Sequence, residues 1–203
     1  MFKPVYAIGD SHSGTLHPWC HAINCGAETI YTLTTGRTER IILGLTQMGQ
    51  ISRNALWVFC FGEIDIRCHV HNQIHVKHRD EHEVLSKLVD DYLAKIETLH
   101  DDIAVMSVVP PVYYDNRKHE VDADPASLIY QIRGSDEERS RYTEFLNLYL
   151  EEQCASNGIP YLDIYSLYKD EKGMLPIDIS DGNVHILNRS KVEVFLKSIG
   201  LIP

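Results

Sequence analysis

The fold is decided by residues 5–14, which read VYAIGDSHSG. An apolar run typical of a buried strand ends at Gly9, and small polar residues that can open a helix follow it at once. Ligands of α/β proteins bind outside the carboxyl ends of the strands, which is where this pattern places Ser11. The first amides of a helix have no intrahelical partner and can bind an anion beside that hydroxyl. We therefore treat Ser11 as a candidate nucleophile, although serine is also a common helix cap.

Short apolar runs alternate with helical periods along the chain, as in a parallel sheet covered by helices on both faces. The expected strands are Val5–Ile8, Thr29–Leu33, Leu56–Phe61, Ile103–Val109 and Tyr161–Tyr165. The expected helices lie near Glu39–Ser52, Glu81–His100, Asp136–Asn157 and Arg189–Ile199. The sequence therefore predicts a single α/β domain over residues 1–203. We expect a flavodoxin-like three-layer α/β/α sandwich, with five parallel strands in the order 2-1-3-4-5.

The composition of the 203 residues argues against some classes of binding partner. A formal net charge of −10 argues against a nucleic-acid-binding face, which is normally basic. No apolar run approaches the roughly 18 residues of a membrane helix, and the N-terminus lacks the pattern of a signal peptide. The five cysteines form no recognisable disulfide or zinc framework. We expect a cytoplasmic protein with reduced thiols and with neither a nucleic-acid nor a membrane partner.

Two segments after predicted strands carry further candidates. The stretch 110–135 has prolines, tyrosines and no lasting period, and we expect it to be a loop that covers the substrate. Phe61–His69 concentrates two acids, an arginine and a histidine at the end of the third strand. Because the carboxyl ends of neighbouring strands face one crevice, this segment should face Ser11. Its charges either bind substrate directly or form an internal salt-bridge network around Arg67.

The other end of the chain offers a carboxylate and an imidazole close together, Asp181 and His185. With Ser11 they would supply a nucleophile, a general base and an acid that orients the base. The pattern thus favours nucleophilic catalysis, with the two ends of the chain meeting above the sheet.

Taken together, these blocks resemble the SGNH (GDSL-like) hydrolases. The resemblance is carried by Gly9-Asp10-Ser11, a glycine turn after the second strand, Gly62-x-x-Asp65 and the late Asp/His pair, and it spans nearly the whole chain. It implies hydrolysis of a small or carbohydrate-linked ester without a cofactor or metal. By resemblance, Ser11 is the nucleophile, His185 the base and Asp181 its orienting acid. The Ser11 and Gly36 amides would bind the oxyanion.

Two departures from that family change the expectations. The family has an oxyanion-binding asparagine where this chain has Ile64, and losing one such donor typically costs about 10²–10³ in rate. Arg67 or His69 would then have to replace it. With Gly36, Asp10 and Asp65, these residues form the expected oxyanion and substrate-binding set. The family's acid also precedes its histidine by three positions rather than four, so Asp178 rivals Asp181.

Other functions fit some of the same residues. A two-metal phosphoesterase would use Asp10, His12, Glu63, Asn183 and His185 as ligands. An acyltransferase would use the same serine and histidine while excluding water, and a catalytically weak carbohydrate-binding relative would share the scaffold.

A histidine-rich stretch is a separate feature of the sequence. His71, His75, His78 and His82 would form one stripe on a continuous α-helix, near His69. Surface histidines are the simplest interpretation, with an active-site rim or a metal site as alternatives.

Overall fold

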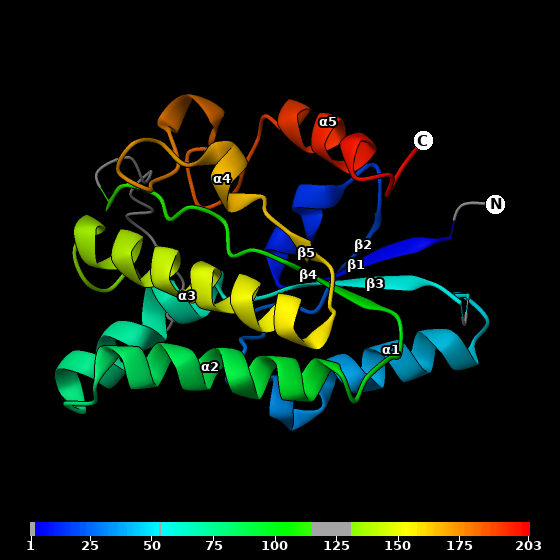
Figure 1. The fold of residues 1–203 in the computed structure, drawn as a ribbon, viewed down its shortest axis with the longest axis horizontal. Coiled ribbons are helices and arrows are strands. Elements are labelled where there is room, and N and C mark those ends of the chain that lie inside the picture. The colour runs from blue at the N-terminus through cyan, green and yellow to red at the C-terminus, as the bar shows by residue number, and fades with distance from the viewer. Residues whose placement is uncertain (1–2, 53, 115–130) are drawn as a thin grey trace, which may run out of the picture.

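A five-stranded parallel sheet forms the centre of the computed structural model, which describes residues 3–52, 54–114 and 131–203 (Figure 1). The strands are β1 (Val5–Gly9), β2 (His21–Asn24), β3 (Leu56–Cys60), β4 (Ile103–Met106) and β5 (Tyr161–Leu162). Their order is β2-β1-β3-β4-β5, which confirms the predicted topology. The predicted loop over 110–135 lies largely outside the described residues.

Helices cover both faces of the sheet, which makes the three predicted layers (Figure 1). One face carries α1 (Arg37–Gln47), α2 (Glu81–Ile96) and α3 (Asp136–Asn157). The other carries the short α4 (Tyr165–Tyr168) and α5 (Ser190–Ser198). In the part of the chain that the structure describes, we find no helix with both the length and the apolar character needed to cross a membrane.

Alternate residues of each strand enter two different cores, because successive side chains point to opposite faces of a sheet. Ile8, Trp57 and Phe59 pack with α1, α2 and α3. The alternating residues Ala7 and Val58 pack with α5 in the second core. The side chains on the α5 face are thus the smaller ones at these positions. Burial on both faces explains why the central strands read as continuous apolar runs.

The helix bounds follow from local capping. Ser135 and Glu138 form a reciprocal capping box at the start of α3, and Gly158 ends this helix in a left-handed conformation. Asp80 caps α2 by accepting a hydrogen bond from the Glu83 amide at 2.9 Å. These signals are readable in the sequence, and the predicted bounds of α3 are confirmed.

The predicted second strand, Thr29–Leu33, is wrong. The Thr29 and Thr32 hydroxyls accept hydrogen bonds from each other's amides, at 3.0 and 2.9 Å, and fold this segment into a turn. A 3₁₀ helix over Leu33–Thr35 follows it. The edge strand on this side of the sheet is β2, which is short and mostly exposed and therefore carries only a weak apolar signal.

Other predicted elements are shorter than expected. The strand predicted over Ile103–Val109 ends at Met106, and the one over Tyr161–Tyr165 ends at Leu162. Asn147 of α3 replaces the sheet as partner of the Val108 amide and carbonyl, with distances of 2.8 and 2.9 Å. All five cysteines are free and buried.

Candidate active site

Ser11 lies at the carboxyl end of β1, an interior strand of the sheet, where the chain enters a 3₁₀ helix over Ser11–Leu16. Gly9 approaches β3 so closely that a Cβ atom would lie 1.9 Å from a carbonyl oxygen of that strand, so only glycine fits. Asp10 caps the helix by accepting a hydrogen bond from the His12 amide at 2.8 Å. The Ser11 side chain is exposed. Its amide, at the first position of the helix, has no hydrogen-bond acceptor within that helix.

Asp181 and His185 lie in the loop that precedes α5. Asp181 Oδ1 accepts hydrogen bonds from the amides of Asn183 at 2.8 Å and His185 at 3.2 Å, which folds the loop back on itself. Asp181 Oδ2 lies 2.7 Å from His185 Nδ1, and His185 Nε2 lies 2.8 Å from Ser11 Oγ. The turn therefore accommodates the four-residue spacing. The rival acid, Asp178, is exposed on the preceding 3₁₀ helix, Ile177–Ile179.

The protonation of this array follows from its contacts. Partial burial opposes ionisation of Asp181, but hydrogen bonds from His185 and Asn183 outweigh it and hold the pKa of Asp181 below its usual value. A carboxylate that accepts from Nδ1 leaves Nε2 of a neutral imidazole free to accept the serine proton. The arrangement is therefore chemically suited to proton abstraction from Ser11.

His12, beside the serine, is buried and bonded on both sides. Its Nδ1 lies 2.9 Å from Asp10 Oδ1, and its Nε2 lies 3.0 Å from the Val184 carbonyl oxygen. Both partners only accept hydrogen bonds, so a doubly protonated ring satisfies them. Burial opposes that charge, but Asp10 and Glu63 outweigh it and raise the pKa of His12 to about 9.

His12 thereby ties the serine turn to the loop that carries His185, whose ring centroid is 5.0 Å away. Sequence reasoning considered His12 only as a metal ligand. With both ring nitrogens committed to protein acceptors, His12 has no lone pair for a metal, which disfavours the two-metal interpretation.

Two expected substrate-binding acids, Asp65 and Asp10, are buried and accept hydrogen bonds from the protein itself. Asp65 is buried, and its carboxylate accepts hydrogen bonds from the amides of Ile30 at 2.7 Å and Tyr31 at 3.3 Å. It thus holds the turn that replaces the predicted second strand, and burial raises its pKa to about 7. Asp10 is also buried and serves the His12 contacts described above.

The remaining expected oxyanion and substrate residues are placed as follows. The Gly36 amide donates to the Leu33 carbonyl at 3.2 Å, so it is engaged within its own turn. Arg67 Nε pairs with Glu63 Oε1 at 2.8 Å, which is the internal salt bridge that sequence reasoning kept as an alternative. His69 is partly buried, and burial together with the Arg67 charge lowers its pKa. Ile64 is buried and offers no donor.

An open pocket of about 290 Å³ adjoins the Ser11 hydroxyl. Its lining comprises Ser11, Gly14, Thr15, Asp181, His185, Ile186, Leu187 and Arg189. None of the five expected oxyanion and substrate residues is among them. The sequence analysis missed four lining side chains, Thr15, Ile186, Leu187 and Arg189, because they flank the motifs and no pattern singled them out.

Comparison with solved structures identifies the fold. The chain matches a GDSL-like lipase from Bacteroides thetaiotaomicron with a TM-score of 0.60 and 15% identity, covering 97% of this chain and 87% of that one. It matches an acetyl xylan esterase with a TM-score of 0.54 and 12% identity, covering 98% and 100%. It also matches a catalytic mutant of an acetylxylan esterase from Geobacillus stearothermophilus, with a TM-score of 0.51 and 14% identity. This match covers 98% of this chain and 94% of that one.

No family model matches the sequence, and a search of curated proteins finds none significantly similar. The solved structures nevertheless agree on one architecture, a five-stranded parallel α/β sandwich. The chain has the SGNH (GDSL-like) hydrolase fold, a fold on which esterases are built.

Proposed function

We propose that this protein is a serine esterase that hydrolyses a small or carbohydrate-linked acyl ester. The observation that carries the proposal is the continuous array from Asp181 through His185 to Ser11, with distances of 2.7 and 2.8 Å. A hydroxyl, a base and an orienting acid at these distances are the parts that acyl transfer to serine needs.

In the first half-reaction, Ser11 Oγ attacks the ester carbonyl while His185 Nε2 takes the hydroxyl proton. Asp181 keeps the imidazole oriented and stabilises its positive form. In this mechanism the Ser11 amide donates a hydrogen bond to the tetrahedral oxyanion. When the intermediate collapses, the bond to the alcohol breaks, and His185 returns its proton to that oxygen.

In the second half-reaction, His185 removes a proton from water as the water attacks the acyl-serine. Collapse of this second intermediate reforms the serine hydroxyl and releases the acid. Because buried Ile64 supplies no oxyanion donor, we expect turnover about 10²–10³ below that of a site with such a donor.

The pocket supports a small acyl group and a polar alcohol. Thr15 and Arg189 offer hydrogen-bonding groups beside the serine, and Leu187 offers an exposed apolar side chain. Two of the solved structures with this fold are acetylxylan esterases, which act on acetylated carbohydrate. The pocket's openness to water favours hydrolysis over acyl transfer to another acceptor.

The test is hydrolysis of p-nitrophenyl acetate, combined with fluorophosphonate labelling and mass mapping of the modified residue. Wild-type protein should be labelled on Ser11, and Ser11→Ala should lose both labelling and turnover while keeping its circular dichroism spectrum. Ser156→Ala, at an exposed serine of α3, is the matched control and should behave as wild type. Unlabelled wild type without turnover would favour the carbohydrate-binding alternative.

The orienting acid is tested in the same assay. Asp181→Asn should lower kcat by about 10²–10⁴, because an amide cannot stabilise the imidazolium and can favour the wrong tautomer. Asp178→Asn is the control and should keep kcat within about twofold. Reversed results would assign the orienting role to Asp178.

A further inference from the structure

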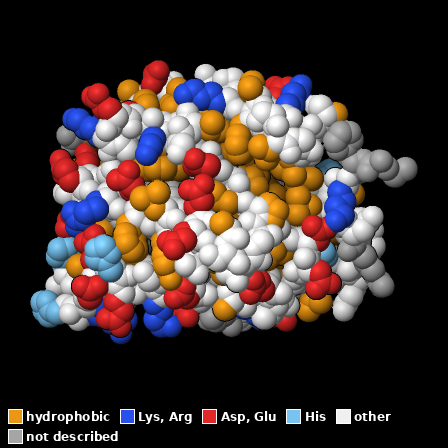
Figure 2. All heavy atoms as spheres, viewed as in Figure 1, with side chains coloured by type: hydrophobic (Ala, Val, Ile, Leu, Met, Phe, Trp, Pro, Cys, Tyr) orange, Lys and Arg blue, Asp and Glu red, His pale blue; other side chains and the backbone are white. Residues whose placement is uncertain are grey.

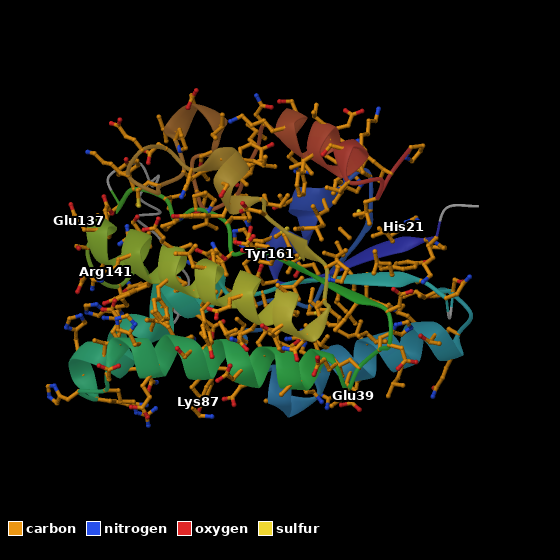
Figure 3. All side chains as sticks on the ribbon, viewed as in Figure 1. His21, Glu39, Lys87, Glu137, Arg141 and Tyr161 are labelled. Atoms are coloured by element: carbon orange, nitrogen blue, oxygen red, sulfur yellow. The ribbon has the colours of Figure 1, made fainter. Side chains whose placement is uncertain are left out.

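Three potential metal ligands converge where the segment after β3 meets the first turn of α3. Two wide, π-type helical turns follow β3, over Asp65–Val70 and Asn72–Val76. His71 lies between the two turns, and His75 lies in the second. Glu138 belongs to α3, and one ligand atom from each of the three residues lies within 4.8 Å of the other two. Figure 2 shows histidines gathered at the end of the molecule where α2 and α3 begin. Figure 3 shows Glu137 and Arg141 of α3 there.

The predicted stripe of four histidines does not form. The wide turns end before His78, which has a left-handed backbone conformation, and α2 begins only at Glu81. His82 instead packs edge-on against Phe145. Only His71 and His75 stay together, with ring centroids 4.3 Å apart.

The donor atoms of this cluster are only partly used within the protein. His71 Nδ1 is buried without a hydrogen-bond partner among the described residues, and it lies 3.7 Å from Glu138 Oε2. His75 Nε2 lies 2.7 Å from Glu138 Oε1. The Nδ1 atom is thus shielded from solvent beside a carboxylate but too far from it for a hydrogen bond, and a cation between the two would satisfy both.

Charge and space both suit a cation at this point. The Glu138 carboxylate supplies negative charge beside the two imidazole rings. Gly134 leaves the space open, since a Cβ atom there would lie 2.9 Å from His71 Nδ1.

We propose that His71, His75 and Glu138 form a binding site for a divalent cation of the zinc class. Two imidazoles and one carboxylate make a three-ligand set that leaves a fourth position for water. Tetrahedral bonds of about 2.0–2.1 Å place ligand atoms about 3.3 Å apart, so side-chain adjustments suffice. His75 is 45% exposed and gives the ion a route from solvent.

The bound ion would fasten the wide helical turns to α3. The Ser135 amide donates a hydrogen bond to Glu138 Oε2 at 2.8 Å, which holds the carboxylate in place. None of the three ligands lines the Ser11 pocket, so the expected effect is on stability rather than on ester hydrolysis.

The test is titration of untagged protein with zinc chloride by calorimetry, alongside thermal unfolding. We expect one site per chain and a rise in Tm of about 5–10 °C when free zinc is 100 times Kd. Visible absorption of bound Co²⁺ reports the coordination directly. His71→Ala and His75→Ala should each weaken binding more than tenfold.

Two variants separate metal binding from helix capping and from general histidine content. Glu138→Gln keeps an acceptor for the Ser135 amide, so its fold should persist while zinc affinity falls more than tenfold. His78→Asn removes a histidine from the same stretch, tolerates the left-handed backbone and should bind zinc as wild type does.

The proposal is overturned if wild type binds no zinc, or if His71→Ala and His75→Ala bind it as tightly as wild type does. In either case the cluster is only an ion pair. Ser11→Ala should bind zinc normally, so failure of the esterase proposal and failure of the metal proposal are distinguishable.

Discussion

His12 connects the two segments that carry the proposed catalytic residues Ser11 and His185. Its ring contacts Asp10, directly after β1, and the carbonyl of Val184, which lies 172 positions after His12 in the sequence. These two hydrogen bonds of His12 involve no predicted catalytic atom, yet they hold the loop that carries His185, the proposed base. Its position directly after Ser11 was visible, but nothing in the sequence showed which acceptors would meet the ring.

Because the folded-state pKa of His12 is raised from 6.5 to about 9, its contribution to stability should depend on pH. The contribution is fully present below pH 6.5 and is lost as pH rises through 9, and it amounts to about 3 kcal/mol. Urea unfolding of wild type at a series of pH values should show this loss. His12→Asn should lack that part of the slope, and equal slopes in both proteins would contradict the prediction.

At the scale of elements, the sequence predicted strands by apolar content and therefore misplaced the edge strand. β2 is short and mostly exposed, whereas the Thr29–Leu33 segment is richer in apolar and β-branched residues yet turns back on its own threonine hydroxyls. The long central strands and α3 were predictable because burial on two faces and a capping box leave local signals. A hydrogen bond from a distant carboxylate, such as that of Asp65, leaves no such signal.

Asp65→Ala tests whether this acid is structural. Removing its carboxylate leaves the buried Ile30 amide unpaired, so unfolding free energy should fall by about 1–3 kcal/mol. Turnover per folded molecule should change less than tenfold. Thermal unfolding and p-nitrophenyl acetate kinetics measure the two effects separately. A fully folded variant with turnover reduced a hundredfold would restore the substrate-binding role.

At the scale of the whole molecule, the second core joins the two ends of the chain. Leu16, the last residue of the 3₁₀ helix that begins at Ser11, is buried in the same hydrophobic cluster as Leu196 of α5. Residues of the central strands belong to this cluster too. The predicted meeting of Ser11 with His185 and Asp181 thus has a physical basis in packing. Motif order sufficed to predict that meeting, whereas the pocket lining depended on side chains such as Leu187 that carry no motif.

Leu196→Ala should therefore lower unfolding free energy by about 2–5 kcal/mol, since the side chain is fully buried. Val194→Ala on the same helix is the control, because Val194 is 70% exposed and its loss should cost under about 0.5 kcal/mol. Chemical denaturation measures both. Equal losses would show that α5 does not hold the second core together.

Because all five native cysteines are buried, a thiol introduced at the surface can be labelled selectively. Burial raises the pKa of Cys20 and of Cys25 to about 11, so little thiolate exists at neutral pH. The other three thiols are also enclosed by the fold. A single cysteine introduced at an exposed position would accordingly take up a maleimide dye ahead of the native ones, and fluorescence reporters need no cysteine-free background.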